Sequence, residues 1–335
     1  MKVLRFIALL SAGICFLQAC KPSNTTENLG NTDNPITNKE SESLFVQLPP
    51  SKSGINFINK LVETDSANIL TYGYFYNGSG VAVGDLNNDS LPDLFFTSNQ
   101  GRGALYLNEG GMKFREVTSE AGIIAEGWCT GVSFADIDND GWLDIYINRS
   151  NHHKSRDERG NLLYRNNGDG SFTEEGEKRG LADPGYGSNS NFFDVDNDGD
   201  LDVFLANHPT EIGMDIRKSN AKKKSDEYST DRFFINDGNG FFSDVSTKAG
   251  IESYAFSLST LASDFNNDGY TDLYVCNDFY FPDFLYINQG DGTFKEELGK
   301  YFKHTSTNSK GSDIADINND GKQDLMVLDM LPGNN

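Results

Sequence analysis

The sequence predicts an all-β fold, a β-propeller in which four-stranded antiparallel blades follow one another around a ring. Three observations support this expectation: an acidic nine-residue motif occurs five times, strand-like apolar runs flank each copy, and Gly-rich hairpins recur after them. The copies start 51, 58, 70 and 52 residues apart. Four short strands at such a period are typical of a propeller blade, because an isolated unit of this size would bury little core.

The acidic motif reads D-x-[DN]-x-D-[GS]-x-x-D. Its copies are Asp85–Asp93 (DLNNDSLPD), Asp136–Asp144 (DIDNDGWLD), Asp194–Asp202 (DVDNDGDLD), Asp264–Asp272 (DFNNDGYTD) and Asp316–Asp324 (DINNDGKQD). Positions 1, 3, 5 and 9 offer side-chain oxygens, and position 7 offers its backbone carbonyl. Gly at position 6 permits a sharp turn, so Ser90 in the first copy is expected to strain or weaken its loop.

Oxygen ligands in this number favour Ca²⁺, and we expect up to five structural ions. The motif holds no Cys or His, which disfavours softer metals, and Mg²⁺ prefers to keep more of its water. Ordinary turns also use Asp, Asn and Gly, but they do not need acid at fixed positions. The predicted ligands are Asp85, Asn87, Asp89, Asp93, Asp136, Asp138, Asp140, Asp144, Asp194, Asp196, Asp198, Asp202, Asp264, Asn266, Asp268, Asp272, Asp316, Asn318, Asp320 and Asp324.

Position 12 separates this motif from the EF-hand, which carries a bidentate Glu there between two helices. Here position 12 is apolar and lies in a β-type run in every copy, at Phe96, Ile147, Leu205, Val275 and Val327. We therefore place each loop between the first two strands of a blade, which we name A and B.

Two more strands complete each predicted blade. Strand C runs into a hairpin such as LLYRNNGDGSF, and strand D is expected over FREVTSEAGI, FTEEGEKRGL, FSDVSTKAGI and FKEEL. Leu44–Phe57 echoes strand D and is expected to complete the last blade from the N-terminus. The fifth unit stops without a recognisable strand C, so we expect either a fragment of a longer protein, which we favour, or an irregular closure of the ring.

These motifs resemble the FG-GAP, or VCBS-type, repeats of integrin α-subunit propellers. The order GVAVGDLNNDSLPDLFF…ALYLNEGGMKFREVTSEAGI more closely resembles bacterial relatives of the cartilage acidic protein family. The resemblance covers the chain from about residue 44 to its end. It implies a seven-bladed ring, an extracellular location and structural Ca²⁺ in the A–B loops, whereas only five loops occur here, which leaves five to seven blades open.

The N-terminus predicts a lipid-anchored envelope protein. Residues 1–20 combine Lys2 and Arg5 with an apolar run and then L-Q-A-C, which indicates a signal peptide with a lipobox and lipidation of Cys20. Cleavage by ordinary signal peptidase is the alternative. Residues 21–43 are expected to form a flexible tether, followed by the propeller over residues 44–335. The outer membrane is the expected location, with the periplasmic or surface side left open.

Charge and cysteines exclude several kinds of function. The net charge is −22, and the five loops hold 18 of the 50 acidic residues, so much of the acidity belongs to the predicted metal sites. This charge excludes a nucleic-acid partner. Cys129 and Cys276 lie in strands of different blades, and we expect two buried free thiols rather than a disulfide.

A partner is expected on the face formed by the B–C and D–A loops, opposite the metal loops. This face carries the longest connections, 148–161 and 207–232, and long loops on a rigid scaffold commonly bind ligands. Its notable residues are His152, His153, His208, Arg217, Lys218, Lys222–Lys224, Asp278, Phe279, Tyr280, Phe281 and Asp283. Polar side chains exposed to water, a solvated insertion and aromatic packing are the simpler explanations for these groups.

Two functions remain open from the sequence. The first is a non-catalytic, Ca²⁺-stabilised binding or adhesion module of the cell envelope, with a protein or polysaccharide partner. The alternative is the propeller domain of an envelope hydrolase or lyase acting on glycans, with His152, His208 and Asp278 at the ring centre. The first is favoured because the sequence carries no signature of a nucleophile triad or a phosphate loop.

Overall fold

The computed structural model describes residues 45–150, 155–209, 228–251, 253–279 and 281–330. The chain divides into two units, residues 1–47 and 48–335, and the second holds every sheet described below. The signal peptide, Cys20 and the tether predicted from the sequence lie outside the described residues. No helix among these residues is long and apolar enough to cross a membrane.

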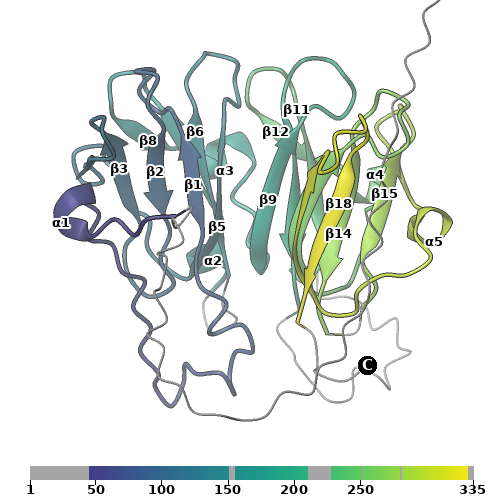
Figure 1. Cartoon of the computed structure of the whole chain (residues 1–335), viewed down its shortest axis with the longest axis horizontal. Helices are drawn as coiled ribbons and strands as arrows, with labels where there is room; N and C mark the ends of the chain where they lie inside the picture. The colour runs from purple at the N-terminus through teal and green to yellow at the C-terminus, as the bar shows by residue number, and fades with distance from the viewer. Residues whose placement is uncertain (1–44, 151–154, 210–227, 252, 280, 331–335) are drawn as a thin grey trace, which may run out of the picture. The chain divides into compact units, whose positions relative to one another are not determined.

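Four sheets contain four antiparallel strands each, in sequence order, and a fifth contains two (Figure 1). The first comprises β1 (Val81–Gly84), β2 (Asp93–Phe96), β3 (Ala104–Asn108) and β4 (Phe114–Glu116). The second comprises β5 (Cys129–Ala135), β6 (Asp144–Arg149), β7 (Leu162–Asn166) and β8 (Phe172–Glu174). The third comprises β9 (Gly187–Phe193), β10 (Asp202–Asn207), β11 (Arg232–Asn236) and β12 (Phe242–Asp244). The fourth comprises β13 (Ser257–Ser263), β14 (Asp272–Asn277), β15 (Phe284–Asn288) and β16 (Phe294–Glu296), and the fifth comprises β17 (Ser309–Ala315) and β18 (Asp324–Asp329).

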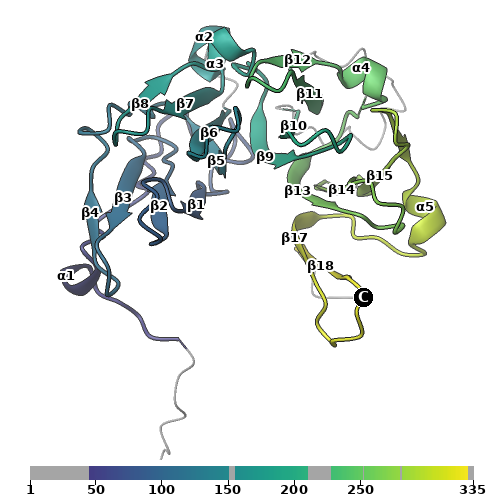
Figure 2. The same ribbon diagram turned by 90° about the horizontal axis from the view of Figure 1, so that it is seen from above.

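Consecutive sheets pack face to face within the second unit, as Figure 2 shows from above. The second strands β6, β10 and β14 are buried along nearly their whole length, which explains their continuous apolar runs. Each apolar core joins neighbouring sheets: Phe95 and Ile145 share one cluster, and Phe204 and Leu273 share another. The prediction of a β-propeller-like arrangement of four-stranded blades is confirmed.

The first strands β1, β5, β9, β13 and β17 lie side by side from one sheet to the next. Small residues permit this approach, because a Cβ on Gly131 would lie 2.7 Å from the carbonyl oxygen of Ser188. Hydroxyl groups then join the sheets: Thr130 Oγ1 donates to the Gly187 carbonyl at 2.8 Å, and Ser188 Oγ donates to the Ser257 carbonyl at 2.7 Å. The small and polar character of the predicted A strands follows from this contact.

The fourth strand of each blade is shorter than the sequence predicted. It ends after three residues, and in three blades a one-turn helix follows it: α3 (Gly176–Arg179), α4 (Ser246–Ala249) and α5 (Leu298–Tyr301). The cause is local, because the acidic residue that ends the strand accepts a hydrogen bond from the backbone N–H two residues later. These bonds are 2.9 Å for Glu174 to Gly176, 2.9 Å for Asp244 to Ser246 and 2.8 Å for Glu296 to Leu298. The remaining short helix of the second blade, α2, spans Arg156–Arg159 between β6 and β7.

In the first three blades, a glycine ends the turn that follows the fourth strand and contacts the next blade. Gly180 has a φ of +82°, and a Cβ there would lie 2.4 Å from the carbonyl oxygen of Phe242, the first residue of β12. Gly54 repeats this geometry after α1 (Pro50–Ser53), with 2.3 Å to the carbonyl oxygen of Phe114 at the start of β4. The second half of the predicted N-terminal segment, from α1 onward, therefore occupies the position of the turn after a fourth strand. Residues 46–49, where the fourth strand itself was expected, form no strand.

The importance of the glycine contact can be measured with Gly180→Ala. Gly170 also has a positive φ, +86°, but nothing lies within 4 Å of its added Cβ, so Gly170→Ala is the matched control. Both variants carry the backbone penalty, and only Gly180→Ala forces two sheets apart. We expect Gly180→Ala to cost about 1–3 kcal/mol more than the control in urea unfolding. Equal losses would contradict the contact.

Candidate metal sites

Backbone hydrogen bonds to the first aspartate form each acidic loop. In the second loop, Asp136 Oδ1 accepts from the N–H of Asp140 at 3.0 Å, and Oδ2 accepts from that of Gly141 at 2.8 Å. The same pair of bonds occurs in the other four loops. Position 6 has a positive φ throughout, including +69° at Ser90, so the strain expected from that serine is present.

In the four-stranded blades, the ninth residue is a buried aspartate that ties the loop to the third strand. Asp144 Oδ2 accepts from the Ile137 N–H at 3.2 Å, and Oδ1 accepts from the N–H of Asn166, the last residue of β7, at 2.7 Å. Asp93, Asp202 and Asp272 repeat both bonds in their own blades. The carboxylate at position 9 therefore fixes three strands of a blade relative to one another.

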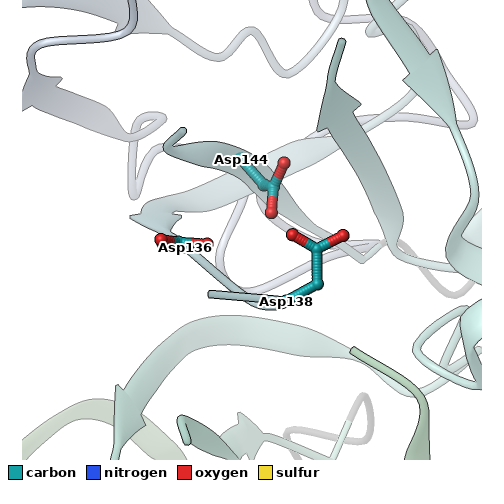
Figure 3. Close-up of side chains that lie close together, drawn as sticks. All are labelled: Asp136, Asp138 and Asp144. Carbon is teal, nitrogen blue, oxygen red and sulfur yellow. The ribbon is translucent and has the colours of Figure 1, made fainter. Parts of the chain in front are cut away.

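Three carboxylates converge in two of the loops. Ligand oxygens of Asp136, Asp138 and Asp144 all lie within 4.8 Å of one another, and Figure 3 shows these side chains around a common space. Asp194, Asp196 and Asp202 form the equivalent group in the third loop. These two acidic triads can hold a metal ion, and their oxygen-only donors suit a hard cation such as Ca²⁺.

The first, fourth and fifth loops carry Asn at position 3 in place of the third carboxylate. Asn87 Nδ2 donates to Asp89 Oδ2 at 3.0 Å, and Asn266 Nδ2 donates to Asp268 Oδ2 at 2.8 Å. These bonds orient the carboxamides of Asn87 and Asn266 so that each side-chain oxygen faces the loop. There it accepts a hydrogen bond from the N–H of position 5. All twenty predicted ligands thus lie in loops of one geometry.

The second loop differs from the others because two arginines neutralise it. Arg165 Nε lies 2.8 Å from Asp138 Oδ2, and its Nη2 lies 2.7 Å from Asp140 Oδ2. Arg179 Nη2 adds a contact of 3.1 Å to the same Asp138 oxygen. The residues at the position of Arg165 in the other blades are Leu107, Ile235 and Ile287. Part of the charge of this loop is therefore balanced by the protein itself.

Asn residues that the sequence analysis did not single out join the loops of neighbouring blades. Position 4 is Asn in all five copies and has a positive φ in each. Its side chain reaches the position-6 carbonyl of the next loop: Asn88 to Gly141 at 3.1 Å, Asn139 to Gly199 at 3.3 Å and Asn197 to Gly269 at 3.2 Å. We call these contacts the Asn links. The invariance of position 4 among the copies was the signal for them.

A second Asn, at the end of the third strand in the second, third and fourth blades, also bridges two blades. Asn166 Nδ2 donates to the carbonyl of Leu143 in its own loop at 3.1 Å and to that of Leu86 in the preceding loop at 2.8 Å. Asn236 and Asn288 make the same pair of bonds. Its position, just before the Gly-rich hairpin in every blade, could have revealed it in the sequence.

The opposite face brings together some of the residues predicted for a partner site. Tyr74 packs edge-on against His208, with ring centroids 4.6 Å apart, and its hydroxyl donates to Asp278 Oδ2 at 3.3 Å. Phe279 and Phe281 pack on the buried Phe256, so they belong to an apolar cluster, as the simpler explanation proposed.

The other predicted residues of this face divide into two groups. Asp283 is structural, since it accepts from Tyr274 Oη at 2.6 Å and from Ser309 Oγ at 2.8 Å. The remaining residues lie outside the described part of the chain: His152, His153, Arg217, Lys218, Lys222–Lys224 and Tyr280.

Cys129 and Cys276 are buried free thiols, as predicted. Burial raises the pKa of each thiol to about 12, so neither forms a reactive thiolate at neutral pH.

The metal-free protein is expected to lose stability as the pH rises from about 4 to 7. Burial, with repulsion from neighbouring carboxylates, raises the pKa of Asp144 and of Asp202 to about 7. The folded state then binds more protons than the unfolded state in this window, so ionisation disfavours folding. Melting temperatures measured in chelator should fall between pH 5 and pH 7.5. A rise over this interval would contradict the stated carboxylate environments.

The sequence matches a family model described as an FG-GAP-like repeat at residues 85–147, 155–205 and 264–327, more than half of the chain. Human (Homo sapiens) cartilage acidic protein 1 is 31% identical over 134 residues, which are 39% of this chain and 20% of that protein. The Xenopus tropicalis protein is 25% identical over 266 residues, 74% of this chain and 39% of the relative. The chain therefore spans less than half the length of these curated relatives.

Two solved structures share features of the fold at low similarity. One is a lectin from Agrocybe aegerita described as recognising non-reducing terminal N-acetylglucosamine, with a TM-score of 0.42 and 18% identity over 74% of this chain and 59% of the lectin. The other is the V. cholerae biofilm matrix protein Bap1, with a TM-score of 0.38 and 18% identity over 75% of this chain and 34% of Bap1. Likeness of this degree carries no functional information. The repeated loops and the matching family model establish that the chain belongs to the FG-GAP-like repeat proteins and resembles the cartilage acidic protein family.

Proposed function

We propose that the chain is a Ca²⁺-stabilised binding module of the cell envelope. The observation that carries the proposal is that the two faces of the blades differ in structure. One face holds five acidic loops of one geometry, and the three Asn links join the first four of them. The opposite face carries long connections and a cavity beside Tyr74 and His208.

The second and third loops suit Ca²⁺ because each brings oxygens of three carboxylates within 4.8 Å of one another. Without a cation, such carboxylates repel one another, and an ion bound among them removes this repulsion. The ion would join strands A and B directly, and it would reach strand C through the aspartate at position 9. With affinities typical of extracellular sites, each ion would add roughly 1–2 kcal/mol at millimolar Ca²⁺.

A partner would bind on the face opposite the loops. The face that carries the acidic loops is filled by hydrogen-bonded loops and tight hairpins, and these contacts fix its shape. The other face combines a rigid framework with connections of varied length, the usual arrangement of binding sites. A protein or a polysaccharide is the expected partner class, and the charge of −22 disfavours nucleic acid.

The envelope location rests on the N-terminal sequence. We propose a signal peptide over residues 1–20, a lipid on Cys20 and a tether over residues 21–43 that holds the module away from the outer membrane. A tether of 23 polar residues spans a few nanometres on average, as expected for a flexible chain.

Binding is favoured over the enzymatic alternative by the partners of the two described candidate groups. Asp278 forms an ion pair with Lys310 and accepts from Tyr74. His208 Nδ1 lies 3.0 Å from the Pro209 carbonyl, and Nε2 lies 3.2 Å from Ser150 Oγ and 3.3 Å from Tyr72 Oη. Both groups are thus engaged in contacts within the protein, which supports a binding role.

Arg165→Leu tests the Ca²⁺ sites, since the equivalent positions already carry Leu or Ile. Without Ca²⁺, Asp140 loses its counter-ion and Asp138 keeps only Arg179, and we expect a loss of about 1–2 kcal/mol in stability. With Ca²⁺, the gain in melting temperature should exceed that of the unmodified chain. Arg115→Leu is the control, because Arg115 pairs with Glu109 and Glu120 and contacts no loop carboxylate. If chelator leaves every melting temperature unchanged, the sites are not structural.

Arrays of glycans and of envelope proteins, probed with Ca²⁺-loaded full-length protein, test the binding function. We expect retention on one of the arrays in Ca²⁺ and a loss of retention in chelator, with the bound glycan unchanged in mass. Cleaved glycan would favour the hydrolase or lyase alternative. No retention on either array would contradict a binding module.

A further inference from the structure

A cavity of about 500 Å³ lies at the ends of the first strands, on the face opposite the metal loops. Residues next to the starts of β5, β9, β13 and β17 line it together with the segment Tyr72–Gly80, among them Thr130, Ser188, Leu258 and Lys310. Because consecutive first strands lie side by side, the cavity is framed by four blades rather than by one loop. Its volume falls within the range of small-molecule sites, about 300–1,000 Å³, and is too small for a folded partner.

One side of the cavity is aromatic and rigid. Tyr72 packs edge-on against Trp128, with centroids 5.4 Å apart, and against Tyr74 at 6.4 Å. All three side chains are buried, and the cluster continues to Phe75 and Phe256. The rings are therefore held in place before a ligand arrives, which reduces the entropy lost on binding.

The other side of the cavity is polar but nearly neutral. Lys310 is the only charged residue among the described residues that line it, and the buried Asp278 neutralises it in an ion pair. His208 Nδ1 lies against a carbonyl oxygen, which only accepts, so this nitrogen carries the proton. Asn77, Ser79 and Asn189 add amide and hydroxyl groups. An anionic ligand would have to compete with Asp278 for the one cation.

We propose that this cavity binds a neutral saccharide, namely one or two sugar residues at the end of a glycan. A pyranose combines an apolar C–H face, which packs on aromatic rings, with hydroxyls that exchange hydrogen bonds with amides and hydroxyls. It also carries no charge. The inference rests on the proposed binding function and assigns the class of its ligand. Binding of a peptide side chain in the cavity would replace it.

Trp128 reports on the cavity directly. The chain has two tryptophans, and the other, Trp142, is position 7 of the second loop, so Trp142→Phe leaves Trp128 as the sole tryptophan. The neutral glycan retained most strongly on an array is titrated into this Ca²⁺-loaded protein. We expect a saturable change in tryptophan emission, with a Kd that changes less than about twofold between low and high salt because no charge is neutralised.

Two substitutions at the rim locate the site. Tyr76 is 58% exposed and Asn77 is exposed, and both line the cavity, so Tyr76→Ala and Asn77→Ala should fold normally. We expect each to weaken the saccharide by about tenfold, equivalent to about 1.4 kcal/mol. Tyr301→Ala is the matched control, because Tyr301 is 37% exposed on α5 and does not line the cavity.

Several results would overturn the assignment while leaving the binding function intact. These are retention of acidic glycans alone, glycan binding that neither rim substitution weakens, and binding of proteins but of no glycan. The absence of any glycan or protein ligand would instead overturn the binding function itself.

Discussion

The structure depends on a buried carboxylate at the end of the acidic loop in each four-stranded blade. Its two oxygens accept from the second residue of the loop and from the last residue of the third strand, as Asp144 does with Ile137 and Asn166. One side chain thereby sets the position of the loop, the start of strand B and the end of strand C. Its burial also raises the pKa, so the same group that organises the blade favours a neighbouring cation.

The contacts between blades extend this order from one sheet to the next. Neighbouring first strands approach closely because their residues are small, as at Gly131, and hydroxyls such as that of Thr130 bond to the backbone of the next blade. Near the loops, Asn166 joins two blades through a single carboxamide. Apolar cores fill the space between the sheets. Each blade is therefore completed by its neighbours, so a single repeat would not form a stable fold by itself.

Much of the fold could be predicted from the sequence because repetition removed the usual ambiguity of short strands. Five copies of one motif located the A–B loops, and the apolar residue at position 12, such as Ile147, identified the strand after each loop. The fourth strand was predicted too long because Glu174 and its equivalents stop it through local hydrogen bonds that apolar patterning does not reveal. The cavity was only partly foreseen: His208 was identified, but Tyr72 and Trp128 come from connecting segments without a repeat. Pairing between residues far apart in the sequence, as between Arg179 and Asp138 of the second blade, depends on three-dimensional neighbours and has no local signal.

The Asn links all point the same way along the chain. Each donor precedes its acceptor, by 53 residues from Asn88 to Gly141, by 60 from Asn139 to Gly199 and by 72 from Asn197 to Gly269. During synthesis, a loop therefore emerges from the ribosome before the carbonyl that will hold its side chain. Until the next blade folds, water takes the place of that carbonyl at the exposed carboxamide. Asn166, in contrast, donates back to the loop before it, so the junction between the first two blades is closed by bonds given from both sides.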